Sequence, residues 1–165
     1  MDPASRFAAM VSGPPAGLRL DHACALLAAS FTGRERVDEV CGMLDDLANR
    51  CAEASLRGVL GTMRGRMRGN VAEYEDPRNS FIDEVLDRGL GLPITLCVIA
   101  IEIGRRVGAP IVGIGLPGHF IVRDEGHPVY GDPFHEGSVY DKDGVRGAWT
   151  HLVGPRPCTP CPPVR

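Results

Sequence analysis

Apolar residues recur with helical spacing in the N-terminal part of the chain. The clearest pattern covers residues 35–53, where the apolar positions fall on one face of a helix. These positions are Val37, Val40, Cys41, Leu44, Leu47, Ala48 and Cys51. A shorter helix is expected from Asp21 to about Phe31, and another over about 56–66. The two cysteines on the apolar face are predicted to be core residues, because unpaired cysteine behaves as a small apolar side chain.

The segment 93–107 carries conflicting signals. It is rich in β-branched residues, which favour strands. Pro93 is nevertheless a favourable first helical residue, and Gly108 followed by Pro110 is a typical stop signal. The run is also long for a strand. We therefore predict a helix, and the continuous apolar stretch over 96–101 predicts that it is buried on nearly every side.

After Pro110 the pattern changes to short apolar runs, some with period two. These runs predict strands over 111–116, 119–123 and 128–134. Helices followed by strands indicate an α+β fold, with N-terminal helices, a buried central helix and a small antiparallel sheet.

The composition also divides the chain into parts. Residues 1–17, rich in Pro, Gly, Ala and Ser, are expected to form a flexible lead-in. Residues 18–145 form the predicted domain, with a helical part over 18–68 and a core over 69–145. Prolines crowd the end of the stretch 146–165, which predicts a disordered tail because proline can continue neither a helix nor a central strand.

Charge and cysteine usage exclude several classes of function. The net charge is −3, from 21 acidic and 18 basic residues, so no strong positive field favours nucleic acid or an anionic membrane. No stretch holds the ~18 consecutive apolar residues that a membrane span requires. The N-terminus lacks the pattern of a signal peptide. We therefore expect a cytoplasmic protein whose six cysteines are reduced.

Two chemically active side chains are predicted to meet on adjacent strands. If the turn after the second strand is centred between Glu125 and Gly126, His119 lies directly opposite Asp132 on one face of the sheet. An imidazole beside a carboxylate is the arrangement of a general base and the group that orients it. Taken singly, His119 is more simply a packed strand residue, and Asp132, which precedes Pro133, a turn residue. The opposed pair favours a functional site.

Other candidate groups have simpler explanations. Cys158 and Cys161 form a single CxxC motif to which His151 could add a ligand, but zinc sites with this motif usually need a second ligand pair. We expect an incidental tail sequence. A basic cluster follows the third predicted helix and consists of Arg64, Arg66 and Arg68. It is expected to be a solvated helix end, with a site for an anionic ligand as the alternative.

A metal site is a further alternative at the predicted pair. His119, Asp132 and His135 would supply two histidines and one carboxylate. His135 lies three residues after Asp132, however, and in an extended strand it would point to the opposite face of the sheet. We therefore expect neither a metal nor another cofactor.

Four short motifs follow one another between residues 76 and 134. They are Asp-Pro-Arg-Asn-Ser at 76–80, Gly-Leu-Gly-Leu-Pro-Ile-Thr-Leu at 89–96, Gly-Leu-Pro-Gly-His-Phe at 115–120 and Gly-Asp-Pro-Phe at 131–134. Together with the helix end Glu-Ile-Gly-Arg-Arg-Val-Gly-Ala-Pro, they resemble the transglutaminase-like domain of the bacterial SirB-type proteins. The resemblance covers roughly residues 18–140 and implies a papain-related fold.

The resemblance also implies where a catalytic triad would lie. Members of the wider superfamily use cysteine, histidine and aspartate in that order, with the cysteine at the start of a buried helix. His119 and Asp132 match the last two. The expected cysteine position, fifteen residues before the helix-ending Gly108, is occupied by Pro93. Cys97 lies one turn deeper on the same helical face, and we expect a core residue there, with a displaced nucleophile as the alternative.

Two functions therefore stay open, and fold alone does not decide between them. One is a degenerate, non-catalytic module that keeps the His119–Asp132 pair and binds a peptide or a partner protein. The other is a cysteine-dependent acyl transferase or amide hydrolase, in which Cys97 attacks, His119 acts as base and Asp132 orients it. The missing thiol at the helix start favours the binding module.

Overall fold

The computed structural model describes residues 1–14 and 17–153, and side chains through residue 147. The helices are α1 (Pro3–Val11), α2 (Leu20–Thr32), α3 (Val37–Asn49), α4 (Leu56–Met63), the 3-10 helix η1 (Pro77–Ser80), α5 (Ile82–Arg88), α6 (Pro93–Val107) and α7 (Lys142–Val153). The strands are β1 (Arg68–Gly69), β2 (Leu90–Gly91), β3 (Ile111–Leu116), β4 (His119–Asp124), β5 (Tyr130–Asp132) and β6 (Ser138–Tyr140). The predicted α+β order, helices first and then a small antiparallel sheet, is confirmed.

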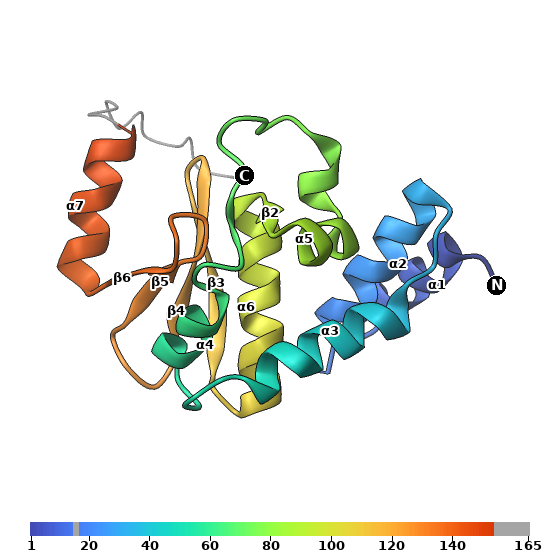
Figure 1. Cartoon of the computed structure of the whole chain (residues 1–165), viewed down its shortest axis with the longest axis horizontal. Helices are drawn as coiled ribbons and strands as arrows, with labels where there is room; N and C mark the ends of the chain where they lie inside the picture. Colours follow the sequence, from blue (N-terminus) through green and yellow to red (C-terminus); the bar gives the residue numbers. More distant parts are fainter. Residues whose placement is uncertain (15–16, 154–165) are drawn as a thin grey trace, which may run out of the picture.

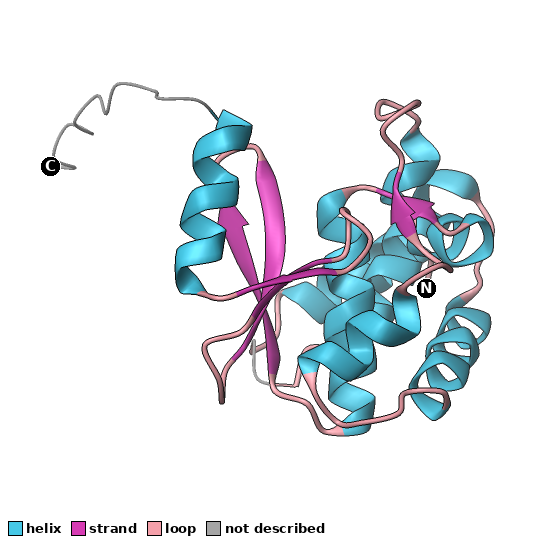
Figure 2. Cartoon of the chain, turned by 60° about the vertical axis from the view of Figure 1, so that its left-hand side comes forward, coloured by secondary structure: helices cyan, strands magenta, loops and turns pink. Residues whose placement is uncertain are grey.

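The sheet lies on one side of α6, and helices α2 and α3 lie on the other. Strands β3 to β6 form one antiparallel sheet in sequential order, while β1 and β2 form a separate parallel pair. Helix α6 packs against β3 and β4 on one side and against α2 and α3 on the other, while α4 contacts both α6 and β5 (Figure 1). Helix α7 lies beyond the sheet, next to β6 (Figure 2).

Helix α6 has the predicted bounds. Pro93 is its first residue, and Gly108 ends it in the left-handed conformation, with φ of 78°. Such a conformation is accessible to glycine at little cost because it lacks a Cβ atom. The side chains of Leu96, Ile99 and Ile103 are fully buried between the two layers. Burial on both sides therefore outweighs the strand preference of the β-branched residues.

Both ends of the described chain contain more regular structure than predicted. Helix α1 forms within the expected flexible lead-in, and Phe7 and Met10 pack against the hydrophobic core. The side chain of Asp2 caps this helix by accepting the N–H of Ser5. Helix α7 continues to Val153, so the expectation of disorder is wrong for residues 146–153. Residues 154–165 lie outside the described part.

The turn between β4 and β5 is longer than predicted. Val122 pairs with Gly131 and Arg123 with Tyr130, and the N–H of Asp124 donates to the carbonyl of Val129. Four residues therefore form the loop, and the register differs by two residues from the prediction. Because side chains alternate between the two faces of a strand, a shift of two leaves every side chain on its predicted face.

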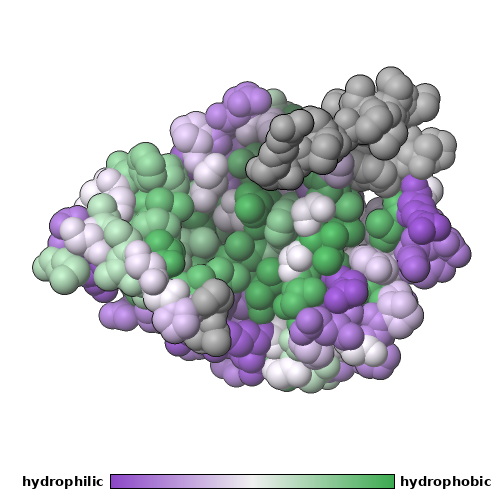
Figure 3. All heavy atoms as spheres, turned by 180° about the vertical axis from the view of Figure 1, so that it is seen from behind, coloured by the Kyte–Doolittle hydropathy of each residue, from purple (hydrophilic) through white to green (hydrophobic). Residues whose placement is uncertain are grey.

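Apolar side chains also reach the surface. Figure 3 shows them gathered in the middle of the face opposite to that of Figure 1. Among the described helices, none has both the length and the apolar character needed to cross a membrane.

Candidate functional site

His119 and Asp132 are in contact, although not through the predicted pairing. The Nε2 atom of His119 lies 2.7 Å from Oδ2 of Asp132. His119 begins β4 and Asp132 ends β5, and the observed register makes them diagonal neighbours on one face of the sheet. Diagonal neighbours are within reach of a long or aromatic side chain. Both side chains are nearly buried, at 11% and 4% exposed.

Asp132 is held by hydrogen bonds on both of its oxygens. Oδ1 accepts the backbone N–H groups of Phe134 and His135, at 3.0 and 3.3 Å. Oδ2 lies 2.7 Å from the Nδ1 atom of His135 as well as from His119. Burial alone would raise the pKa of Asp132, but the hydrogen bonds with His119 and His135 outweigh it and lower that pKa below its usual value. The carboxylate form is thereby stabilised.

The prediction that His135 faces away from Asp132 is wrong. Strand β5 ends at Asp132, and the chain then forms a turn through residue 137. Three residues along a turn bring a side chain back toward its starting point, whereas three residues along a strand reverse it. Pro133, which cannot donate a hydrogen bond in a sheet, is the signal that could have revealed this strand end.

The ring of Phe134 packs against both histidines that contact Asp132. It packs edge-on against the imidazoles of His119 and His135, with ring centres 5.8 and 5.2 Å apart. The two imidazoles lie 5.4 Å apart. The ring fits because residue 69 is glycine: a Cβ atom there would lie 2.5 Å from the phenyl carbons. The cluster therefore depends on a close approach between Phe134 and the backbone of β1.

Cys97 lies in the second turn of α6 and is fully buried. Its Sγ donates to the backbone carbonyl oxygen of Phe120 on β4, at 3.4 Å. Burial, and to a smaller extent the charge of Asp132, raises the pKa of the Cys97 thiol far above its usual value. Among the described side chains, no hydrogen bond joins Cys97 to His119.

Two groups of described residues have metal-ligating atoms close enough to share an ion. They are His119, Asp132 and His135, and Asp21, His22 and Cys41, and within each group the candidate ligand atoms lie within 4.8 Å of one another. In the first group both nitrogens are 2.7 Å from the carboxylate oxygen. A distance of 2.7 Å between a nitrogen and an oxygen is typical of a hydrogen bond. Two atoms that both bind one zinc ion, each at ~2.0–2.1 Å from the metal, lie farther from each other than this. The CxxC cysteines lie outside the described residues.

A groove opens beside this cluster. It has a volume of about 830 Å³ and runs between residues 68–73 and 134–136, with Leu90 at one end. The N–H of Gly69 donates to the carbonyl oxygen of Phe134, at 2.9 Å, and ties the two walls together. His135 therefore contacts Asp132 on one side and lines the groove on the other.

The chain belongs to the transglutaminase-like superfamily. The family described by that name matches residues 21–158, most of the chain. The α+β architecture described above is consistent with that fold. No solved structure matches the chain.

Its relatives include bacterial proteins named UPF0162. The chain is 48% identical over 93 residues to such a protein of Xylella fastidiosa strain Temecula1, covering 54% of this chain and 33% of the relative. It is 30% identical over 126 residues to UPF0162 protein PA3419 of Pseudomonas aeruginosa, covering 74% of this chain and 44% of the relative. A shorter match, 31% identical over 58 residues, joins it to human F-box only protein 21 and covers 35% of this chain and 9% of the relative. The matches thus span less than half the length of these curated relatives.

Proposed function

We propose that this domain is a SirB-type, non-catalytic binding module whose groove takes an extended peptide segment of a partner protein. The observation that carries the proposal is the environment of Cys97, the cysteine that the resemblance offers as a displaced nucleophile. It is fully buried, and its thiol hydrogen is engaged by the carbonyl oxygen of Phe120.

Cysteine catalysis needs a thiolate. The thiolate is the nucleophile, and its formation is favoured at a helix N-terminus or beside a cation. Pro93 occupies the first turn of α6, and Cys97 lies one turn further on, where the effect of the helix dipole has faded. The raised pKa of the Cys97 thiol leaves very little thiolate at neutral pH.

The groove has the features of a peptide site. Its walls combine apolar surface, from Val71 and Phe134, with polar groups from Glu73 and His135. Val71 is 75% exposed, so its side chain is accessible to a ligand in the groove. A mixed apolar and polar lining is typical of binding sites that need both contact area and orientation.

The alternative function is acyl transfer by Cys97, His119 and Asp132. It is favoured by the hydrogen bond between His119 and Asp132, which would orient the imidazole as a general base. This alternative requires the Cys97 thiol to leave the carbonyl oxygen of Phe120 and to reach His119.

Alkylation of the native protein by iodoacetamide distinguishes the two functions. We expect Cys97 to react at least about tenfold more slowly than N-acetylcysteine at pH 7.4, because each unit of raised pKa reduces the thiolate fraction tenfold. Peptide mass mapping gives the rate for each cysteine. The rate at Cys97 should be the same in a His119→Ala variant. Alkylation faster than the free thiol, and slowed by His119→Ala, would favour the acyl-transfer enzyme.

Binding is tested with peptides selected from a displayed random library. Their affinity, measured by fluorescence polarisation, should fall by about tenfold or more in Val71→Ser, because the groove loses buried apolar contact. The matched control is Phe31→Ser, since Phe31 on α2 is 74% exposed and lies outside the groove. Equal effects of the two substitutions, or no selected peptide, would rule out the groove as the binding site.

A further inference from the structure

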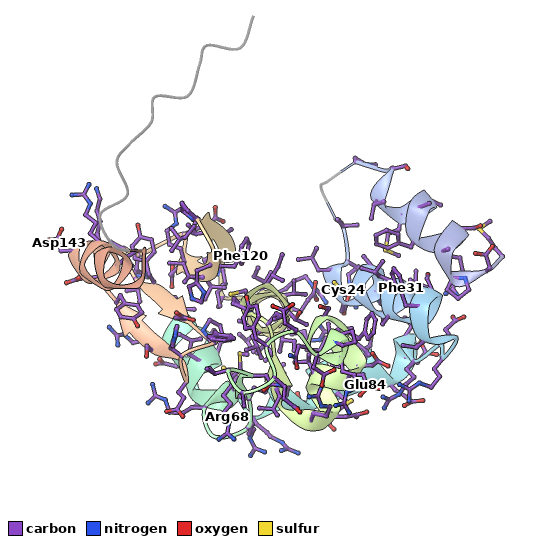
Figure 4. The ribbon with its side chains drawn as sticks, turned by 90° about the horizontal axis from the view of Figure 1, so that it is seen from above. Cys24, Phe31, Arg68, Glu84, Phe120 and Asp143 are labelled. Carbon is purple, nitrogen blue, oxygen red and sulfur yellow. The ribbon has the colours of Figure 1, made fainter. Side chains whose placement is uncertain are left out.

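A second pocket adjoins the groove and is lined by arginines. It has a volume of about 330 Å³ and lies between residues 64–68 and 88–90, with Glu136 at its edge. Four arginines contribute to its walls, namely Arg64, Arg66, Arg68 and Arg88. Arg68, Leu90 and Glu136 line both this pocket and the groove, so the two spaces are neighbours. Arg68 lies at the surface of the molecule (Figure 4).

The parallel pairing of β1 with β2 brings this arginine pocket together. Arg68 pairs with Leu90, which places the end of α5 beside the segment that follows α4. Arg88, the last residue of α5, thereby joins three arginines that precede it by twenty or more residues in the sequence. A basic cluster that forms only on folding, from two separate segments, differs from the single solvated helix end expected from the sequence.

Three of the four arginines in the pocket form no ion pair with a described residue. Arg64 donates to the backbone carbonyls of Glu136 and Gly137, at 3.4 and 3.1 Å, contacts that hold its guanidinium without cancelling its charge. Arg66 and Arg68 are exposed and form no ion pair with a described residue. Glu136 is the one carboxylate in the lining.

Arg88 is the one arginine of this pocket that has an ion-pair partner among the described residues. Its side chain is 19% exposed, and its Nη2 lies 3.3 Å from the carboxylate of Asp76. Asp76 is shared, because Arg78 binds the same carboxylate at 2.7 Å. The Nη1 of Arg88 is buried and has no hydrogen-bond partner among the described residues. The ion pair with the shared carboxylate of Asp76 therefore leaves part of the donor capacity of Arg88 unused.

We infer that the arginine pocket binds carboxylate groups, and that the peptide segment taken by the groove is therefore acidic. Arginine binds carboxylates through two parallel hydrogen bonds, and this pocket offers several guanidinium groups around one small space. The shared wall at Arg68 lets one extended segment occupy the groove with one part and the pocket with another. The inference rests on the proposed function, because the same segment fills both spaces.

The test uses each selected peptide in two versions. The acidic version keeps its aspartate and glutamate residues, and in the amide version asparagine replaces aspartate and glutamine replaces glutamate. We expect the amide versions to bind the native protein at least tenfold more weakly. In the double variant Arg66→Gln/Arg68→Gln the acidic and amide versions should bind within twofold of each other. The control is Arg57→Gln, since Arg57 is an exposed arginine of α4 outside both pockets, and it should keep the full preference for the acidic versions. Circular dichroism checks that each variant is folded.

The outcomes separate the inference from the proposed function. Peptides that bind equally well in acidic and amide form, or lose their acidic preference equally in Arg57→Gln, would overturn the arginine pocket and leave the groove. A selection that yields no binder would overturn both. Inorganic phosphate serves as a further probe at constant ionic strength. If phosphate binds saturably, loses binding in Arg66→Gln/Arg68→Gln and does not compete with the peptides, the site takes a free anion and the acidic segment is excluded.

Discussion

Two clusters of described residues combine a histidine, a buried aspartate and a third potential metal ligand. In one, Asp21 contacts His22 and lies near Cys41; in the other, Asp132 contacts His119 and His135. The residue types are almost the same, but the surroundings differ. Asp21 also forms ion pairs with three arginines, whereas the two described ionisable side chains that contact Asp132 are both imidazoles.

The arginines make the first cluster a joint between helices. Arg106 of α6 binds Asp21 of α2 at 2.6 Å and also Glu102, one turn earlier in its own helix, at 2.8 Å. Glu102 in turn accepts the N–H of Leu20, at the start of α2. Burial alone would raise the pKa of Asp21, but its hydrogen bonds with Arg19, His22 and Arg106 outweigh it and hold that pKa far below its usual value.

Among the described residues, the second cluster has no permanently charged partner, and it lies beside the groove. Its carboxylate is oriented by two backbone amides and two imidazoles, and one of those imidazoles reaches the groove wall. The comparison teaches that a histidine–aspartate contact is not by itself a functional signal. The charges around it and its access to a cavity distinguish a structural joint from a candidate site.

Substitution of the joint should have the largest effect. Asp21→Asn removes the buried charge that Arg106 shares with Arg19 and leaves Arg106 only Glu102 as a buried carboxylate partner among the described residues, so the free energy of unfolding should fall by ~3–5 kcal/mol. Urea denaturation at pH 7 measures it. The control is Asp45→Asn, because Asp45 binds the same arginine but is 63% exposed, and its loss should cost ~1 kcal/mol or less. Equal losses would remove the distinction between the joint and an ordinary surface ion pair.

A smaller loss is expected from crowding the second cluster. Gly69→Ala places a methyl group against the Phe134 ring and should lower the free energy of unfolding by ~1–3 kcal/mol, since overpacking strains a close contact. The imidazole NMR signals of His119 and His135 should move as the ring shifts. Gly61→Ala, where a Cβ atom meets nothing within 4 Å, should be neutral or slightly stabilising. Unmoved imidazole signals in Gly69→Ala would contradict the support that we assign to Phe134.

The smallest effect should depend on pH. Asp132→Asn removes a charge that accepts four hydrogen bonds and should cost ~1–2 kcal/mol at pH 7. The pKa of Asp132 is lowered in the folded state, so its ionised form adds stability above the unfolded value of ~3.9 and loses it as the pH falls through the folded value. Urea denaturation of both proteins between pH 7 and pH 3 should show their difference shrinking below about pH 4. A constant difference over that range would mean that ionisation of Asp132 contributes nothing.

Local signals in the sequence predict the central helix well. Pro93 and Gly108 mark both ends of α6, because each acts through its own backbone and needs no distant partner. The contact between His119 and Asp132 was also predictable, since it requires only that two adjacent strands show the same face. Whether these residues act in catalysis stays a prediction.

The remaining features depend on contacts that no local pattern reports. Strands β1 and β2 have two residues each, too few for a periodic signal, yet they join Arg88 to the arginines of 64–68. The position of His135 depends on where β5 ends, and α1 is stabilised by packing of Phe7 and Met10 against residues of the core. Such features follow from tertiary contacts, which a sequence pattern constrains only weakly.

The two-residue difference in the β4–β5 register has a consequence for how this site tolerates change. The loop from Glu125 to Pro128 can gain or lose residues in pairs while His119 and Asp132 continue to share one side of the sheet. A single inserted residue that altered the pairing by one would instead turn the imidazole away from the carboxylate. Shifts of the pairing by one and by two residues should thus have opposite effects on the site, although neither changes a site residue.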